Sequence, residues 1–295
     1  MRASRANRYV LTLSLFLFIC TGTALGQGGR CLIRRQVADT SKWHDEARCL
    51  LRKVQMDRKL GPSLTNLPTP LDSLVGKTNV IDKVVLDRYL TENNIEPVRL
   101  GGPLETSITM ARYFVIHDTS WPNYERADFP KNEVLNGNDW SRGRLERLKS
   151  GEKTHVWVDR VGESITSTDY ARMTPKSAVK LEDRYPNLKG LFLHTELIQP
   201  RRCHPDRPVC CYRDRKGERH CSDPISPTPG FSDAQYDRLA LLYVAASSRR
   251  GVWLVPAFHG VVDDEFGNGA HDDPQNFDLE VWATHLADLI NKLSP

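Results

Sequence analysis

The chain has 295 residues, and its 41 lysines and arginines against 37 aspartates and glutamates give a formal net charge of +4. Residues 1–26 have the pattern of an export signal, because three arginines precede an apolar run from Val10 to Cys20 and small residues follow it. Loss of these arginines would lower the charge to +1, which does not favour electrostatic binding to nucleic acid or to a membrane surface. The apolar run is too short for a membrane span, and no later run approaches the ~20 residues required. We expect an exported protein, periplasmic or secreted, with no nucleic-acid partner and no membrane span.

Six cysteines lie beyond residue 26. An even number in an exported protein indicates up to three disulfides. Cys31 and Cys49 are close enough in sequence to form a local pair, and the other four fall between Cys203 and Cys221. The alternative for the second group is a zinc knuckle that also uses neighbouring histidines. Its spacing matches no standard zinc pattern, so we expect disulfides.

Residues 27–109 are predicted to form a helical N-terminal extension. Two segments in this range, 41–54 and 80–93, carry apolar residues at intervals of three and four, which is typical of amphipathic helices. The Pro-rich segment between them, 60–72, is predicted to be an extended connection.

Residues 110–295 alternate between predicted strands and predicted helices. Short apolar runs predict strands at 111–120, 190–198 and 252–260, and two alternating runs around a glycine predict a hairpin at 154–170. The sequence therefore predicts an α/β fold with a mixed central β-sheet flanked by helices.

Two helices are predicted in the second half of the chain. Ser232 and Gln235 form a capping box at the start of the first, and Gly251 ends it. The second begins near Asp278 and carries a stripe of apolar residues to the C-terminal end. Before these helices, residues 199–230 form a cysteine-rich insert with little apolar content, which needs cross-links to hold a shape.

His117 and His259 each close a predicted apolar strand, where a side chain can be held rigidly at the edge of a sheet. Catalytic zinc prefers imidazole nitrogens with a carboxylate or thiolate, and keeps one position open for water. The segment 269–278, "GAHDDPQNFD", offers the third ligand. In an extended chain its His271 and Asp273 would point to the same side.

Four segments occur in the order found in a known family: "YFVIHDTS", "GLFLHTELI", "LVPAFHG" and "HDDPQNFD". The chain resembles the zinc-dependent N-acetylmuramoyl-L-alanine amidases of the amidase type 2 group, whose fold peptidoglycan recognition proteins share. The resemblance covers roughly residues 110–293. It implies an amidase type 2-like domain that hydrolyses the amide between N-acetylmuramic acid and L-alanine in peptidoglycan. The alternatives are a peptidoglycan-binding module without catalysis and a zinc amidase of the same fold that acts on a different amide.

Carried over by position, the resemblance implies that Zn²⁺ is bound by His117, His259 and Asp273. Glu196 matches the family's acidic residue on a central strand and would act as general base and then as general acid. His271 stands where some members have a lysine, and would stabilise the oxyanion. The open alternative is that His271 binds the metal and Asp273 orients it.

Two further histidines and an acidic segment lie near these motifs. His194 shares its strand face with Glu196, and either supports a ligand from behind or supplies a fourth nitrogen near the metal. His155 opens a neighbouring strand, and either contacts the substrate or forms a structural hydrogen bond. The acidic residues 263–265 are predicted to lie in a solvated loop, with a second cation site as the alternative.

Overall fold

The computed structural model describes Cys31 and residues 42–137, 145–151, 153–172, 188, 190–206, 211–213, 215, 217, 219–221, 224–266 and 271–294. The expected export signal and Cys210 lie outside these residues.

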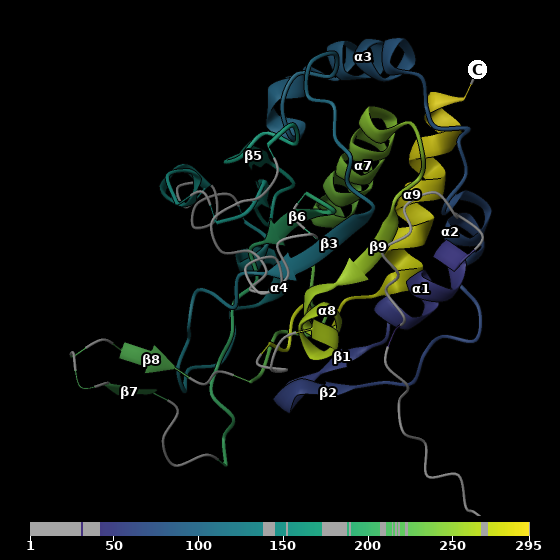
Figure 1. Cartoon of the computed structure of the whole chain (residues 1–295). Coiled ribbons are helices and arrows are strands. Elements are labelled where there is room, and N and C mark those ends of the chain that lie inside the picture. Colours follow the sequence, from purple (N-terminus) through teal and green to yellow (C-terminus); the bar gives the residue numbers. More distant parts are fainter. Residues whose placement is uncertain are drawn as a thin grey trace, which may run out of the picture.

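A five-stranded sheet forms the centre of the fold, with strand order β5-β4-β6-β3-β9 (Figure 1). Its strands are β3 (Tyr113–Asp118), β4 (Val156–Val158), β5 (Ser164–Thr166), β6 (Phe192–Leu197) and β9 (Val255–Phe258). Strands β4, β6, β3 and β9 run parallel, and β5 pairs antiparallel with β4 in the hairpin that the sequence predicts. The mixed sheet and the α/β class are therefore confirmed. The parallel strands bring four carboxyl ends to one edge of the sheet.

Different helices cover the two faces of this sheet. Phe114 of β3 packs edge-on against Tyr243 of α7 (Asp233–Arg250), with ring centroids 5.5 Å apart. The adjacent Tyr113 points the other way, and its hydroxyl donates to Glu46 of α1 (Trp43–Leu50) at 3.0 Å. Since alternate residues of a strand face opposite sides, the end of β3 places His117 on the face of Tyr113 and α1.

Helices α7 and α9 (Leu279–Leu293) run side by side (Figure 1). The predicted capping box is present at α7: the Ser232 hydroxyl accepts from the Gln235 backbone N–H at 3.2 Å, and the Gln235 side chain accepts from the Ser232 N–H at 3.2 Å. Gly251 ends the helix with φ of 75°, a conformation that favours glycine. The side chain of Asp278 caps α9 by accepting from its first turn. Both helices and their caps are confirmed.

The helices expected in the N-terminal part are present as α1 and α3 (Lys83–Glu92). The Pro-rich segment 60–72 is not extended throughout, because it ends in a short helix, α2 (Thr69–Leu74). Pro70 lies in the first turn of α2, where a missing N–H removes no helical hydrogen bond. The shorter elements here are β1 (Val54–Gln55), the 3₁₀ helices η2 (Met56–Arg58) and η3 (Pro97–Leu100), and β2 (Lys59–Leu60).

The N-terminal helices share one core with the sheet. Leu50, Leu71 and Leu86, one from each of α1, α2 and α3, are completely buried in the same hydrophobic cluster as Phe114 and Val255. α1 contacts β9, and α2 contacts α9. Of these helices, α1 covers the face of the sheet on which His117 lies, whereas α2 and α3 pack against α9 and α7.

The strand predicted over 252–260 ends earlier, at Phe258, and the chain continues directly into a helix, α8 (His259–Phe266). The prediction of a solvated acidic loop over 263–265 is therefore wrong. Glu265 is not solvated, because its carboxylate forms a salt bridge of 3.1 Å with the buried Arg52. That partner lies 213 residues away in the sequence, so no local pattern reveals it.

The cysteine-rich insert contains a separate antiparallel ribbon of β7 (Cys211–Arg213) and β8 (Arg219–Cys221), which projects from the body of the protein (Figure 1). The predicted disulfide between Cys31 and Cys49 is present, with Cα atoms 5.6 Å apart. Cys203 is also disulfide-bonded, which excludes it from a zinc knuckle. One further short helix, α4, spans Asn132–Leu135. Within the described part of the chain, no helix combines the length and the apolar character required to cross a membrane.

Candidate metal centre

Polar side chains form a row across the sheet at the carboxyl ends of its parallel strands. His117 of β3 lies opposite Glu196 of β6, and Glu196 lies opposite Trp157 of β4. On the other side of β3, strand β9 ends one residue before His259. Residues paired across parallel strands point to the same face, so the register itself brings His117, Glu196 and His259 to one place.

Asp273 completes this group from the segment that precedes α9. The Nδ1 atom of His259 lies 2.9 Å from both carboxylate oxygens of Asp273, and the Nδ1 atom of His117 lies 3.7 Å from its Oδ2 atom. The ring centroids of the two histidines are 4.1 Å apart. All three side chains are buried, so the structure brings together the three residues that the sequence predicts as ligands.

The donor atoms of this cluster have the types and the spacing that a zinc ion prefers. One atom from each of the three residues lies within 4.8 Å of the others. Ligands bound to a tetrahedral zinc ion at ~2.0–2.1 Å lie ~3.3–3.4 Å from one another, and the observed 2.9 and 3.7 Å bracket this value. Two imidazole nitrogens and one carboxylate leave a coordination position for water, which is the arrangement of catalytic zinc sites.

The protonation states of His117 and Asp273 also suit a metal. Burial, and then the neighbouring His259 and His194, hold the pKa of His117 well below its ordinary value, so its ring is neutral. Burial alone would raise the pKa of Asp273, but the charge and hydrogen bond of His259 lower it below its ordinary value. A neutral imidazole and an anionic carboxylate are the forms that bind divalent cations.

Gly260 allows α8 to approach the segment that carries Asp273. Its backbone N–H donates to the carbonyl oxygen of Asp273 at 2.7 Å. A Cβ atom at this position would lie 3.1 Å from that oxygen and 3.2 Å from the carbonyl oxygen of His271. The glycine that follows His259 therefore lets two of the ligand-bearing segments lie in direct contact.

His194 orients His117 from the neighbouring strand. The Nε2 atom of His117 lies 3.0 Å from the Nδ1 atom of His194, and both rings are buried. Burial, followed by the charge of His259, lowers the pKa of His194 to about 3. If the Nε2–H of His117 donates to this neutral ring, its Nδ1 lone pair faces Asp273 and His259. Of the two interpretations of His194, the structure favours an orienting residue over a fourth ligand.

His155 is a structural hydrogen-bonding residue. Its Nδ1 atom accepts from the backbone N–H of His194 at 3.0 Å, and the two rings stack with centroids 5.6 Å apart. The side chain is completely buried, beside Tyr170. His155 therefore supports the strand that carries His194 and Glu196, and has no surface for contact with a substrate.

Glu196 lies beside the cluster and opens onto a cavity. Its Oε1 atom is 3.7 Å from the Nδ1 atom of His117, and its side chain is 15% exposed. It lines a cavity of about 470 Å³ together with Trp121, Lys153 and Trp157. Burial, followed by the charge of Asp273, raises the pKa of Glu196 well above its ordinary value. A carboxyl group in this position can both accept and return a proton.

His271 lies against the cluster but is not one of the three residues whose donor atoms lie within 4.8 Å of one another. Its ring centroid is 4.3 Å from that of His259. Its Nδ1 atom lies 3.0 Å from the Oδ2 atom of Asp263, and its backbone N–H donates to the same oxygen at 3.2 Å. Asp263 is thus a buried partner of His271 rather than a residue of a solvated loop. The side chain of His271 is 38% exposed, so it can reach a bound molecule.

Sequence reasoning missed two residues that border the cluster, Asp118 and Arg201. The backbone N–H of Asp118 donates to the Oδ2 atom of Asp273 at 3.3 Å, and the Asp118 side chain pairs with Arg201 inside the protein. The sequence did carry a signal for Asp118, because this residue directly follows His117 in the strand motif. Arg201 lies in the insert, and no local pattern marks it.

Comparisons with known proteins return no match. No protein-family model matches the sequence, and neither a curated protein nor a solved structure is significantly similar to it.

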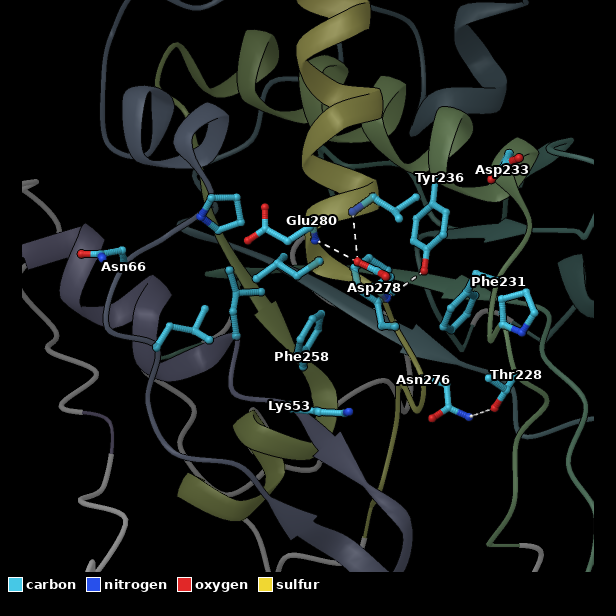
Figure 2. Close-up of a pocket in the computed structure, with 17 residues that line it drawn as sticks. Lys53, Asn66, Thr228, Phe231, Asp233, Tyr236, Phe258, Asn276, Asp278 and Glu280 are labelled. Carbon is cyan, nitrogen blue, oxygen red and sulfur yellow. Dashed lines mark hydrogen bonds between the residues drawn. The ribbon is translucent and has the colours of Figure 1, made fainter.

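A second cavity, of about 700 Å³, lies at the start of α9 (Figure 2). Phe231, Tyr236 and Phe258 contribute apolar surface, and Asp278 and Glu280 lie at its edge. It is larger than the cavity beside Glu196, but none of the described residues that line it belongs to the histidine cluster. Two of its acidic residues, Asp278 and Glu280, are explained by the start of α9, where Asp278 caps the helix and negative charge is favourable. The candidate metal centre therefore borders the smaller cavity and not this one.

Proposed function

We propose that the protein is an exported zinc-dependent amide hydrolase, an N-acetylmuramoyl-L-alanine amidase that acts on peptidoglycan. The observation that carries this proposal is the convergence of His117, His259 and Asp273, with Glu196 beside them at the wall of a cavity. The peptidoglycan substrate rests on the resemblance of the four sequence motifs to the amidase type 2 group. The parallel order β6-β3-β9, with a histidine at the end of β3 and another directly after β9, is consistent with the same fold.

In the proposed site, zinc bound by His117, His259 and Asp273 would polarise the amide carbonyl and lower the pKa of a water molecule. Glu196 accepts one proton from the attacking water as its oxygen bonds to the carbonyl carbon. The carboxyl group then gives this proton to the amide nitrogen as the carbon–nitrogen bond breaks. The second proton of the water passes from the new carboxyl group to the released amine, so the products are a muramic acid carboxylate and a peptide with a protonated alanine amino group.

In this proposal His271 stabilises the oxyanion of the reaction. Its contact with Asp263 favours a ring that carries a proton on Nδ1, and its partial exposure leaves the other edge available to a substrate. A fixed N–H donor or a positive charge near the developing oxyanion lowers the barrier of an acyl transfer. The group of side chains that could hold a metal contains Asp273 and not His271, which supports the first of the two role assignments made from the sequence.

The test is digestion of purified sacculi or muropeptides, followed by mass spectrometry of the products. We expect free stem peptides that begin with L-alanine and one zinc ion per chain. Glu196→Gln should keep the zinc and reduce peptide release about 10²-fold or more. The matched control is Glu280→Gln, the same substitution at the edge of the other cavity, which should leave release unchanged.

Several results would contradict the proposal. Absence of zinc from the purified protein would exclude the metal centre. Undiminished release by Glu196→Gln would exclude its role as base and acid. Binding of peptidoglycan without any release would support a binding module instead, and release from a different amide substrate would retain the chemistry but change the substrate.

A further inference from the structure

A completely buried ion pair lies behind the segment that carries Asp273. The Nη2 atom of Arg201 is 2.7 Å from the Oδ2 atom of Asp118, and both side chains are 0% exposed. The same nitrogen donates to the backbone carbonyl of Asp272 at 3.3 Å, and the Nη1 atom lies 3.6 Å from the Asp272 Oδ1 atom. One guanidinium group therefore joins the end of β3 to the residue that precedes Asp273.

Asp118 transmits this contact to the carboxylate of Asp273. Its backbone N–H donates to the Oδ2 atom of Asp273 at 3.3 Å, the same oxygen that lies 3.7 Å from His117. Its side-chain Oδ2 atom accepts from the backbone N–H of Gln275 at 3.1 Å. The segment 272–275 is thus held on both sides of Asp273, with one end fixed by Arg201 and the other by Asp118.

Charge explains why an arginine is needed here. Asp118, Asp272 and Asp273 would place three carboxylates close together at the end of the sheet, and like charges in a buried region repel strongly. Burial alone would lower the pKa of Arg201, but the charges of Asp118 and then Asp272 raise it above its ordinary value, so the guanidinium remains positive. Its planar fork reaches two partners at once, which the single ammonium group of a lysine does not do.

A buried pair of this kind is weak evidence for a gain in stability, because removing both charges from water offsets much of their attraction. Its geometry gives a more specific explanation. We propose that Arg201 is a positioning residue for the metal: through Asp118 and Asp272 it fixes the carboxylate of Asp273 at the distance where it meets His117 and His259. This inference rests on the proposed metal centre, but it does not depend on which amide is hydrolysed.

The experiment measures zinc affinity by competition with a chromophoric chelator in the full-length protein. Loss of contacts behind a metal ligand weakens metal binding by ~10–100-fold, and we expect a loss in this range for Arg201→Met. Arg201→Lys should bind zinc more tightly than Arg201→Met, because lysine keeps a positive charge beside Asp118 but loses the contact with Asp272. The matched control is Arg202→Met, which removes the adjacent arginine and its surface ion pair with Asp128 and should leave affinity unchanged.

A second measurement separates positioning from folding. Co²⁺ substituted for Zn²⁺ absorbs visible light according to its coordination, and the spectrum should change in Arg201→Met while the far-ultraviolet circular dichroism stays the same. Zinc affinity within twofold of wild type in Arg201→Met would overturn the proposal. If that variant does not fold, Arg201→Lys decides: wild-type affinity and an unchanged cobalt spectrum would overturn it as well.

The outcomes also separate this inference from the proposed function. Wild-type protein that binds no zinc would overturn both. Wild-type protein that binds zinc without releasing alanine-terminated peptides would overturn only the proposed reaction, and weakened binding by Arg201→Met would still support the positioning role.

Discussion

The buried imidazole of His155 should make the stability of the protein sensitive to acid. The side chain is completely buried, and its pKa is held well below its ordinary value by burial and then by His194. The folded protein keeps this ring neutral, whereas the unfolded chain takes up a proton below about pH 6.5. Its contribution to stability is therefore complete above that pH and is lost as the pH falls towards the folded-state pKa. The loss approaches ~1.4 kcal/mol for each pH unit.

The change to make is His155→Gln, which keeps an acceptor for the backbone N–H of His194 but cannot titrate. Between pH 7.5 and pH 5.0, the wild type should lose ~2 kcal/mol of unfolding free energy that the variant does not lose. The measurement is urea denaturation followed by tryptophan fluorescence at both pH values, in the presence of a chelator. Because the other buried groups are present in both proteins, only the difference between the two proteins is interpreted. A difference that stays constant to within ~0.5 kcal/mol would refute a neutral, buried His155.

Three further substitutions test other contacts. Asp263→Asn removes the anionic partner of His271 and should reduce hydrolysis with zinc content unchanged, measured by metal analysis and peptide release; loss of zinc would instead place Asp263 or His271 in the ligand set. Arg112→Met leaves the buried Glu46 without its 2.6 Å ion pair and should lower the unfolding free energy by ~3 kcal/mol or more in urea; a change under 1 kcal/mol would contradict this. Asp278→Ala removes the cap of α9 and should cost ~1 kcal/mol in the same assay, with no change in urea m-value.

Much of the ligand set could be predicted because it depends on strand ends. Apolar runs that finish in polar residues predict strands, so the sequence places His117 and His259 at strand ends. Glu196 and Asp273 were assigned through the resemblance of their motifs, and the alternation along 271–273 left the choice between His271 and Asp273 open. These features are local in the sequence, and the structure has the same elements at nearly the same residues.

The parts that could not be predicted depend on contacts between distant residues. The acidic segment after His259 has a polar composition, and nothing near it shows that Glu265 would meet Arg52 or that Asp263 would meet His271. Its helical structure was missed for that reason. Arg201 meets Asp118 across 83 positions of the chain, and an arginine in a cysteine-rich insert carries no sign that it will be buried.

The geometry of the site therefore depends on the register of the strands in the core. A slip of one residue between β3 and β6 would turn Glu196 and His194 to the opposite face of the sheet, away from His117. Tyr113 and Phe192, which pair at the other end of the same two strands and stack with centroids 4.9 Å apart, oppose such a slip. Tyr113 and Phe192 precede His117 and Glu196 by four positions in the sequence, and neither is a predicted ligand. Their packing nevertheless sets which side chains can meet at the metal, so the geometry of the candidate site is a property of the packed sheet as much as of its ligands.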